Sequence, residues 1–198
     1  MVPIAAVGDK IFRWLVAIDE DTCRRVAAAG CQHCSGPLHR SDYGRKPRGG
    51  LLAAGGEAFT RRLSLCCGWQ GCRRRATPPS VRFLGRRVYV GAAVILASMA
   101  AQALATPREV KRATGIPART VNRWRAWWQG GFVHSRLFAA ERGRFLPPLS
   151  IAELPGSLVE RFAFAARDAG TALVRTLVFL SPLTTLSVVD GSRFVRLP

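Results

Sequence analysis

Two pairs of cysteines constrain the fold of this chain more than any other feature. Cys31 and Cys34 lie in the segment GCQHCSG, and Cys67 and Cys72 lie about thirty residues further on, in CCGWQGC. Structural zinc takes four thiolate or imidazole ligands in a tetrahedron, which two short cysteine turns joined by a hairpin can supply. The spacing therefore predicts a zinc ribbon, in which a closed Zn²⁺ site holds the shape of the domain and performs no chemistry.

The alternatives to a metal site are ordinary buried thiols or, in an exported protein, disulfides. The first residues of the sequence do not form a basic segment followed by an apolar run and a cleavage site, so they indicate no secretion signal. We therefore expect a cytoplasmic, nucleoid-associated protein whose thiols stay reduced and bind metal.

Only one of the adjacent Cys66 and Cys67 is expected to be the third ligand, because neighbouring side chains of a strand face opposite sides. The segment RRLSLCC alternates, with Leu63, Leu65 and Cys67 on one face, which favours Cys67.

Three other residues have a weaker case as metal ligands. His33 lies inside the first cysteine turn, where its side chain points away from a metal, and His39 is expected to face solvent or a phosphate. Cys23 lies in a helix-like stretch and is expected to be a small core residue.

The net charge of the chain is far above what solubility requires. It is +18 over 198 residues, and since only Lys10, Lys46 and Lys111 are lysine, 27 of the 30 basic residues are arginine. Residues 31–107 carry twelve basic and two acidic groups, and residues 108–144 carry nine and two, whereas both ends of the chain are close to neutral. Two separate basic blocks predict two regions that contact a polyanion such as a nucleic acid.

We expect a mainly α-helical protein with a small β zinc ribbon. The segments are N-terminal helices over residues 1–30, the zinc ribbon over 31–87, a helix-turn-helix domain over 88–144, and C-terminal helices for packing or self-association over 145–198. Residues 9–29 are expected to form one or two short helices, with Asp19 to Thr22 as the cap of the second.

Residues 88–106 contain no charged side chain and are nearly long enough to span a membrane. The segment is rich in Ala and Gly, contains Ser98 and Gln102, and continues directly into a polar helical motif. These features favour a buried helix over a membrane span.

The segment TPREVKRATGIPARTVNRWRAWW predicts a helix-turn-helix. Thr106 would cap the first helix, Pro107 would open it, and Gly115 would make the turn. The residues expected to face inward are Val110, Ala113, Ile116, Val121, Trp124 and Trp128, with Trp127 assigned to the core in preference to a stacking surface. Lys111 stands where such motifs usually have a small residue, so the alternative is an αα-hairpin with a basic surface.

In a recognition helix, the outward side chains of the N-terminal half reach base edges, where Arg pairs with guanine and Asn with adenine. The candidate DNA-binding residues of the second helix are Arg119, Thr120, Asn122, Arg123 and Arg125. Three more candidates follow the last cysteine, Arg73, Arg74 and Arg75, and would contact phosphates. All the arginines of CRRRATPPSVRFLGRR are expected to point toward a partner.

The sequence contains no recognisable catalytic constellation. Its twelve carboxylates are scattered, and it has neither a phosphate-binding loop nor a Gly-x-Ser-x-Gly motif. We therefore expect a protein that is not an enzyme.

The chain resembles two kinds of protein that bacterial insertion sequences carry: small zinc-ribbon proteins, and the zinc ribbon plus helix-turn-helix segments of transposases. The resemblance rests on the order of three segments, GCQHCSGPLHR, RRLSLCCGWQGCRRRATPPSVRFLGRR and TVNRWRAWW. Leu65, two residues before the third ligand, and Arg73, just after the fourth, fit the pattern of those ribbons. The resemblance covers residues 31–128, and the C-x4-C second turn departs from the commoner C-x2-C. No acidic catalytic domain follows, so only the DNA-binding half of a transposase is implied.

The resemblance implies a sequence-specific double-stranded DNA-binding protein that acts as an accessory or regulator of a mobile genetic element. Its partners would be DNA and a transposase or recombinase, with the C-terminal helices available for oligomerisation and no membrane involved. Two alternatives stay open. A structural RNA-binding protein of a ribonucleoprotein could use the same arginines on A-form RNA, and an enzyme could have a site that these motifs do not identify.

Overall fold

The structure is a computed structural model that describes residues 9–45, 57–84, 89–104 and 106–185. Its α-helices are α1 (Asp9–Ala29), α3 (Gly91–Ala103), α4 (Pro107–Thr114), α5 (Ala118–Trp127), α6 (Arg136–Glu141), α7 (Gly156–Ala163) and α8 (Ala169–Leu180). Its strands are β1 (Leu38–Arg40), β2 (Tyr43–Gly44), β3 (Arg61–Arg62), β4 (Leu65–Cys67), β5 (Arg75–Ala76), β6 (Phe83–Leu84) and β7 (Tyr89–Val90). Short 3-10 or π turns complete it: η2 (Glu57–Thr60), η3 (Trp128–Phe132), η4 (Arg142–Arg144) and η5 (Ser181–Thr184). The expected mainly helical fold with a few small antiparallel strands is confirmed.

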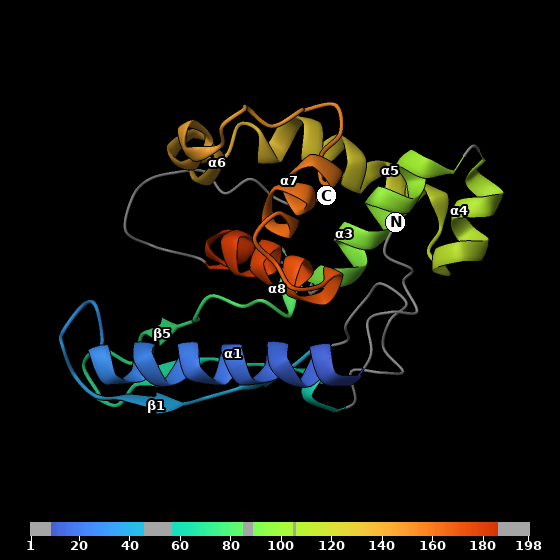
Figure 1. Cartoon of the computed structure of the whole chain (residues 1–198). Helices are drawn as coiled ribbons and strands as arrows, with labels where there is room; N and C mark the ends of the chain where they lie inside the picture. The colour runs from blue at the N-terminus through green and yellow to red at the C-terminus, as the bar shows by residue number, and fades with distance from the viewer. Residues whose placement is uncertain (1–8, 46–56, 85–88, 105, 186–198) are drawn as a thin grey trace.

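Helix α1 runs without a break along the small sheet beneath it (Figure 1). Phe12, Leu15, Asp19 and Cys23 recur every three or four residues and are buried, which puts them on one face. The helix ends at Gly30, whose φ of 76° is the left-handed conformation that glycine adopts readily. The cap predicted at residues 19–22 is wrong, because that segment lies in the interior of this single helix.

Three short antiparallel strands form the sheet that α1 covers, in the order β1-β4-β5. Their register pairs Leu38 with Cys67 and Cys66 with Arg75, so the strand that ends at Cys67 lies in the middle. There are two further antiparallel pairs: β2 with β3, which lie between β1 and β4 in the sequence, and β6 with β7, which follow β5.

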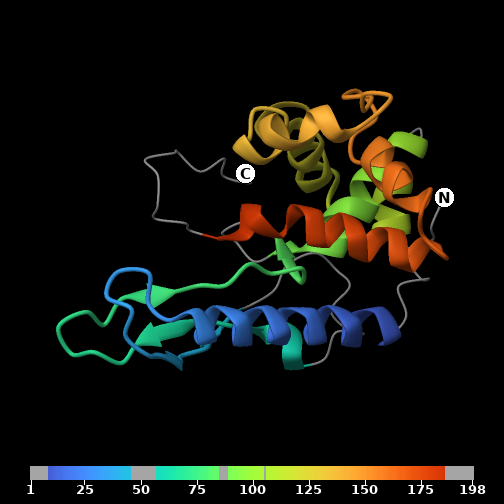
Figure 2. The same cartoon turned by 60° about the vertical axis from the view of Figure 1, so that its left-hand side comes forward.

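Helix α3 forms the centre of a second, helical layer, which lies above α1 and the sheet in Figures 1 and 2. Every residue from Gly91 to Ser98 is buried, because this Ala-rich helix packs against α4, α5, α8 and the β6–β7 hairpin. The buried-helix prediction for this segment is confirmed. Among the residues that the structure describes, no helix has both the length and the apolar character needed to cross a membrane.

Helices α4 and α5 are joined by three residues, as the sequence predicted. Thr106 and Glu109 form a reciprocal capping box at the start of α4, and Gly115 ends that helix with a φ of 68°. Ile116 is buried in the turn. One inward-facing residue was assigned wrongly: Ala113 is exposed, and Thr114 is buried instead, where its hydroxyl donates to the Val110 carbonyl.

The C-terminal helices α7 and α8 pack against each other, and α8 also contacts α1 and α3. Their buried residues are part of one apolar core that includes Phe12 of α1, Phe59 of η2, Ile95 of α3 and Trp124 of α5. The two C-terminal helices thus pack into the core of the chain, and a role in self-association stays a prediction.

Candidate metal centre and nucleic-acid interface

The four paired cysteines meet at one point. Their sulfur atoms all lie within 4.8 Å of one another, with Cys31 Sγ 3.7 Å from Cys72 Sγ and Cys34 Sγ 3.4 Å from Cys67 Sγ. A zinc ion bound tetrahedrally at about 2.3 Å from each sulfur places the sulfurs about 3.8 Å apart. The cluster therefore has the size of a four-thiolate metal site, and it could hold a metal ion.

Two tight turns aim these sulfurs inward. In the first turn, the Ser35 N–H donates to the Cys31 carbonyl at 2.7 Å, and Ser35 has a left-handed φ of 55°. In the second, the N–H groups of Cys72 and Arg73 both donate to the Trp69 carbonyl at 3.0 Å, and Arg73 has a φ of 46°. Non-glycine residues seldom adopt this conformation, so both turns hold their cysteines at some conformational cost.

Gly36 shows how closely the chain wraps the cluster. A Cβ atom at this position would lie 3.3 Å from both Cys34 Sγ and Cys67 Sγ. Such contacts are tighter than most side chains tolerate, so the backbone reaches the sulfurs only because residue 36 lacks a side chain.

The thiols differ in how readily they lose a proton. The backbone N–H of His33 points at the Cys31 sulfur and lowers the pKa of Cys31 to about 7. The Gly36 N–H favours the Cys34 thiolate, but burial and the neighbouring thiols outweigh it and raise the pKa of Cys34 to about 12. Burial also raises the pKa of Cys67. Metal binding at the cluster would therefore have to displace protons from Cys34 and Cys67.

The other two cysteines lie apart from the cluster. Cys66 is half-buried, and its sulfur lies 3.4 Å from the Arg73 carbonyl instead of among the four. The structure thus places Cys67 in the cluster and Cys66 outside it, as strand alternation predicted. Cys23 is buried with Leu63 and Leu65 in a small apolar cluster, which confirms its predicted core role.

Neither predicted alternative ligand belongs to the cluster. His33 is exposed, with its Nδ1 3.5 Å from an Nη1 of Arg74. His39 is also exposed, and its imidazole packs against Gly68. A Cβ atom added to Gly68 would lie 2.5 Å from His39 Nε2.

The three arginines after the cluster are all exposed but differ in what they contact. Arg75 donates to the Ser41 carbonyl at 2.8 Å and the Ser64 hydroxyl at 2.9 Å. Arg73 and Arg74 are exposed and form no ion pair with a carboxylate among the described residues, so their charge faces solvent. Arg75 is therefore partly structural, while the other two form an available cationic surface.

On α5, the candidate residues divide in the same way. Arg119 and Asn122 are exposed, whereas Thr120, Arg123 and Arg125 are half-buried. The Nε atoms of Arg123 and Arg125 are enclosed without a hydrogen-bond partner among the described residues. The expected outward direction thus holds for Arg119 and Asn122 and only in part for Arg123.

The inward face of α5 follows the prediction. Val121, Trp124, Trp127 and Trp128 are all buried, which confirms the core assignment of Trp127. The cysteine turns and the α4–α5 pair lie at opposite ends of the molecule in both Figures 1 and 2.

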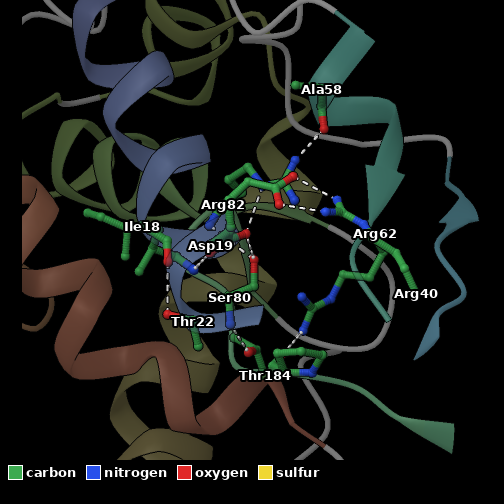
Figure 3. Close-up of polar contacts among 12 residues, drawn as sticks. Ile18, Asp19, Thr22, Arg40, Ala58, Arg62, Ser80, Arg82 and Thr184 are labelled. Atoms are coloured by element: carbon green, nitrogen blue, oxygen red, sulfur yellow. Dashed lines mark hydrogen bonds and ion pairs between the residues drawn. The ribbon is translucent and has the colours of Figure 1, made fainter. Parts of the chain in front are cut away.

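Sequence reasoning missed a buried ion pair between α1 and the chain that follows the sheet. Figure 3 shows Asp19 pointing toward Ser80 and Arg82. Its carboxylate accepts from the Arg82 Nε at 2.7 Å, the Ser80 hydroxyl at 2.5 Å and the Val81 N–H at 2.7 Å. Arg82 is only 2% exposed and also donates to the Ala58 carbonyl.

The ion pair corrects the expectation that the arginines of CRRRATPPSVRFLGRR all point toward a partner. Arg82 is inside the protein, while Arg86 and Arg87 lie outside the described residues. The sequence did contain a signal: Asp19 falls on the same helical stripe as Leu15 and Cys23. An acidic residue on an apolar stripe needs a buried partner.

Comparison with protein-family models, with curated proteins and with solved structures finds no match for this chain. The resemblance to ribbon segments of transposases therefore stays a prediction carried by residues 31–128.

Proposed function

We propose that this chain is a zinc-dependent, sequence-specific double-stranded DNA-binding protein that acts as an accessory or regulator of a mobile genetic element. The observation that carries the proposal is the charge of residues 58–140, which include fifteen basic side chains and a single carboxylate, Glu109. That carboxylate is used in the capping box of α4. Arg62 and Arg82 of this stretch are buried, but its exposed cations, such as Arg73, Arg74 and Arg119, form a surface that favours a polyanionic partner.

Zinc suits the cluster on chemical grounds. Four cysteine sulfurs at tetrahedral separation form the soft ligand set typical of structural zinc. A bound Zn²⁺ would cross-link the two cysteine turns, and with four protein ligands it would leave no position open for a substrate. Cys31, Cys34, Cys67 and Cys72 would hold it, and the exposed Arg73 and Arg74 beside them would offset the negative charge of four thiolates.

Helix α5 is the element best suited to read base pairs. Its inward face is anchored by Val121 and Trp124, while Arg119 and Asn122 project from its first two turns. An arginine and an asparagine are the side chains that pair with guanine and adenine in the major groove, and one good bidentate contact is worth about 1–3 kcal/mol of discrimination. Arg73 and Arg74 would add phosphate contacts that do not depend on sequence.

The mobile-element part of the proposal rests on the resemblance alone. It predicts that the gene for this chain has a transposase or recombinase gene beside it. Gene neighbourhoods without such a partner would remove this part and leave the DNA-binding part intact.

Binding measurements on selected and random duplexes test the DNA-binding part. We expect Asn122→Ala to cost about 1–3 kcal/mol on a site selected from random DNA and to flatten base preference. Arg74→Ala should weaken selected and random duplexes alike and reduce the salt slope by about one. Arg24→Ala is the matched control, since Arg24 is an exposed arginine of α1 paired with Asp21.

The same measurements can contradict the proposal. Equal losses from Asn122→Ala on selected and random duplexes would mean that α5 reads no bases. Tighter binding of structured RNA than of the selected duplex in competition would favour the ribonucleoprotein alternative.

A further inference from the structure

One tryptophan lies exposed between the third and fourth cysteines of the cluster. Trp69 is 60% exposed, whereas Trp124, Trp127 and Trp128 are all buried. Trp14 on α1 is the other exposed tryptophan, at 47%. A single exposed apolar residue is ordinary on a protein surface, so exposure alone does not assign Trp69 a role.

The backbone of Trp69 is held by the second cysteine turn, and its indole lies close to Gly36 of the first. Its carbonyl accepts hydrogen bonds from Cys72 and Arg73 at 3.0 Å, which closes the second cysteine turn. Its indole also approaches the first turn, since a Cβ on Gly36 would lie 3.3 Å from Trp69 Cγ. An aromatic side chain fixed in this way loses little conformational entropy when a partner covers it.

The surroundings of Trp69 favour an anionic partner. No Asp or Glu occurs between residues 58 and 108, and the nearest charged neighbours in sequence, Arg73 and Arg74, are exposed. A partner that combines a flat π-face with negative charge fits this surface, and nucleotides have both properties. The combination of an aromatic platform with adjacent cations is the usual arrangement for binding unpaired nucleotides.

We propose that Trp69 stacks on an unpaired DNA base, while Arg73 and Arg74 bind the flanking phosphates. This inference rests on the proposed DNA-binding function and specifies its ligand as DNA with unpaired nucleotides beside the duplex. Bases inside a duplex are stacked on one another, and the side chains that wedge between them are commonly Phe, Leu, Ile, Met or Pro. A bicyclic indole is better suited to cover the open face of an unpaired base.

The location of Trp69 fits a ligand with two parts. The cysteine turns and α5 lie at opposite ends of the protein (Figure 1). A junction between duplex and single strand offers base pairs to α5 and open bases to the turn that carries Trp69.

The test compares two DNAs that share the selected duplex site, one blunt and one with a three-nucleotide single-stranded overhang. Fluorescence anisotropy would give the affinity of the zinc-loaded full chain for each. We expect Trp69→Ala to weaken binding of the overhang DNA on the order of 5- to 100-fold and to leave blunt-duplex binding unchanged. Trp69→Tyr should retain most of the affinity, Trp69→Leu should lose it, and Trp14→Ala should match the unsubstituted protein on both DNAs.

Zinc content identifies any variant that has lost the cluster. If Trp69→Ala loses zinc, the comparison of Trp69→Tyr with Trp69→Leu decides, because both retain a large side chain and only one retains a ring. Equal binding of the overhang DNA by these two variants would overturn the stacking role and leave duplex binding by α5 standing. A protein that binds neither DNA would overturn the proposed function itself. Unchanged DNA affinity with a changed mass in light scattering would assign Trp69 to a protein interface instead.

Discussion

The two ends of the molecule are held together by different interactions. Near the cysteine turns, the separate apolar cluster contains three buried residues among those that the structure describes, Cys23, Leu63 and Leu65. Around α5, by contrast, Trp124 and Trp128 are fully buried in the large core that runs through the helical layer. Both ends expose arginines, but the interactions that stabilise the backbone beneath those arginines differ.

The difference follows from how much apolar surface each end can bury. Strands of two or three residues are too short to supply a core of their own, so small units of this kind need a metal or disulfide. The helical end has enough apolar side chains to be stable while Arg119 and Asn122 stay in solvent. We therefore expect metal loss to affect one end far more than the other.

Removal of the metal should produce the largest effect. A structural zinc ion in a small domain contributes about 10–16 kcal/mol of apparent binding free energy, which is lost with the metal. After chelation, hydrogen–deuterium exchange should rise strongly in peptides from residues 30–45 and 61–77 and little in peptides from 91–104 and 118–133. Equal rises of exchange in all four peptides would show that the two ends depend on the metal to the same extent.

Serine substitutions provide the matched control for this experiment. Cys67→Ser should lose the metal and reproduce the exchange pattern of the chelated protein, because Cys67 lies in the cluster. Cys66→Ser should retain both metal and protection, because the Cys66 sulfur lies outside it. Metal loss in Cys66→Ser with metal retained in Cys67→Ser would contradict this ligand assignment.

A core substitution at the helical end should have the converse effect. Trp128 is fully buried, its Nε1 donates to the Ser98 hydroxyl at 3.2 Å, and its ring contacts Phe132 edge-on. We expect Trp128→Ala to lower the free energy of unfolding by about 3–5 kcal/mol, through the cavity and the lost contacts, while the metal stays bound. Chemical denaturation and metal analysis would measure both. Trp14→Ala is the control, and a similar loss there would mean that burial does not explain the effect.

The buried ion pair links α1 to residues 80–82, which follow the sheet, so its loss should destabilise the fold. Asp19→Asn would leave the Arg82 guanidinium buried at 2% exposure without its charged partner. Breaking such a pair costs on the order of 3–5 kcal/mol. Asp21→Asn on the same helix removes two exposed ion pairs, with Arg24 and Arg25, and should change the free energy of unfolding by less than about 1 kcal/mol. Equal effects of these two variants in denaturation would contradict the structural role of Asp19.

Most of the local structure could be predicted from the sequence, because it depends on short-range patterns of residues. The alternation of side chains along a strand predicted that Cys67 belongs to the cluster, and the spacing of Gly115 and Pro117 predicted the turn between α4 and α5. The ion pair could not be found in this way, because Asp19 and Arg82 are 63 positions apart and only the packing of α1 brings them together.

Other predictions failed where tertiary packing decides which side chain is enclosed. On α4, Thr114 is buried in place of Ala113, because its hydroxyl is satisfied by the helix backbone and its methyl group can pack inward. On α5, Arg123 and Arg125 are half-enclosed, although helical spacing alone left Arg123 outward. DNA binding, zinc identity and a mobile-element role stay predictions, since none follows from packing.

The smallest effect is expected for a second ion pair of α1, between Glu20 and Arg40, which is more exposed than the Asp19–Arg82 pair. Glu20 accepts two hydrogen bonds of 2.7 Å from Arg40 and so also joins α1 to the sheet, but its side chain is 33% exposed. Solvent screening limits such a pair to about 0.2–1 kcal/mol, so Glu20→Gln should cost far less than Asp19→Asn. The hydrogen bonds from Arg40 lower the pKa of Glu20 below its usual value of 4.5.

A lowered pKa fixes the sign of the pH dependence. The carboxylate contributes its stability in full above about pH 4.5, and this contribution is lost as the pH falls through the lower folded pKa. The difference in free energy of unfolding between the unsubstituted protein and Glu20→Gln should therefore be present at pH 7 and shrink as the pH falls through the lowered folded pKa of Glu20. A difference that grows on acidification would show that the carboxylate is not stabilised by Arg40. A loss at pH 7 as large as that of Asp19→Asn would show that burial does not separate the two pairs.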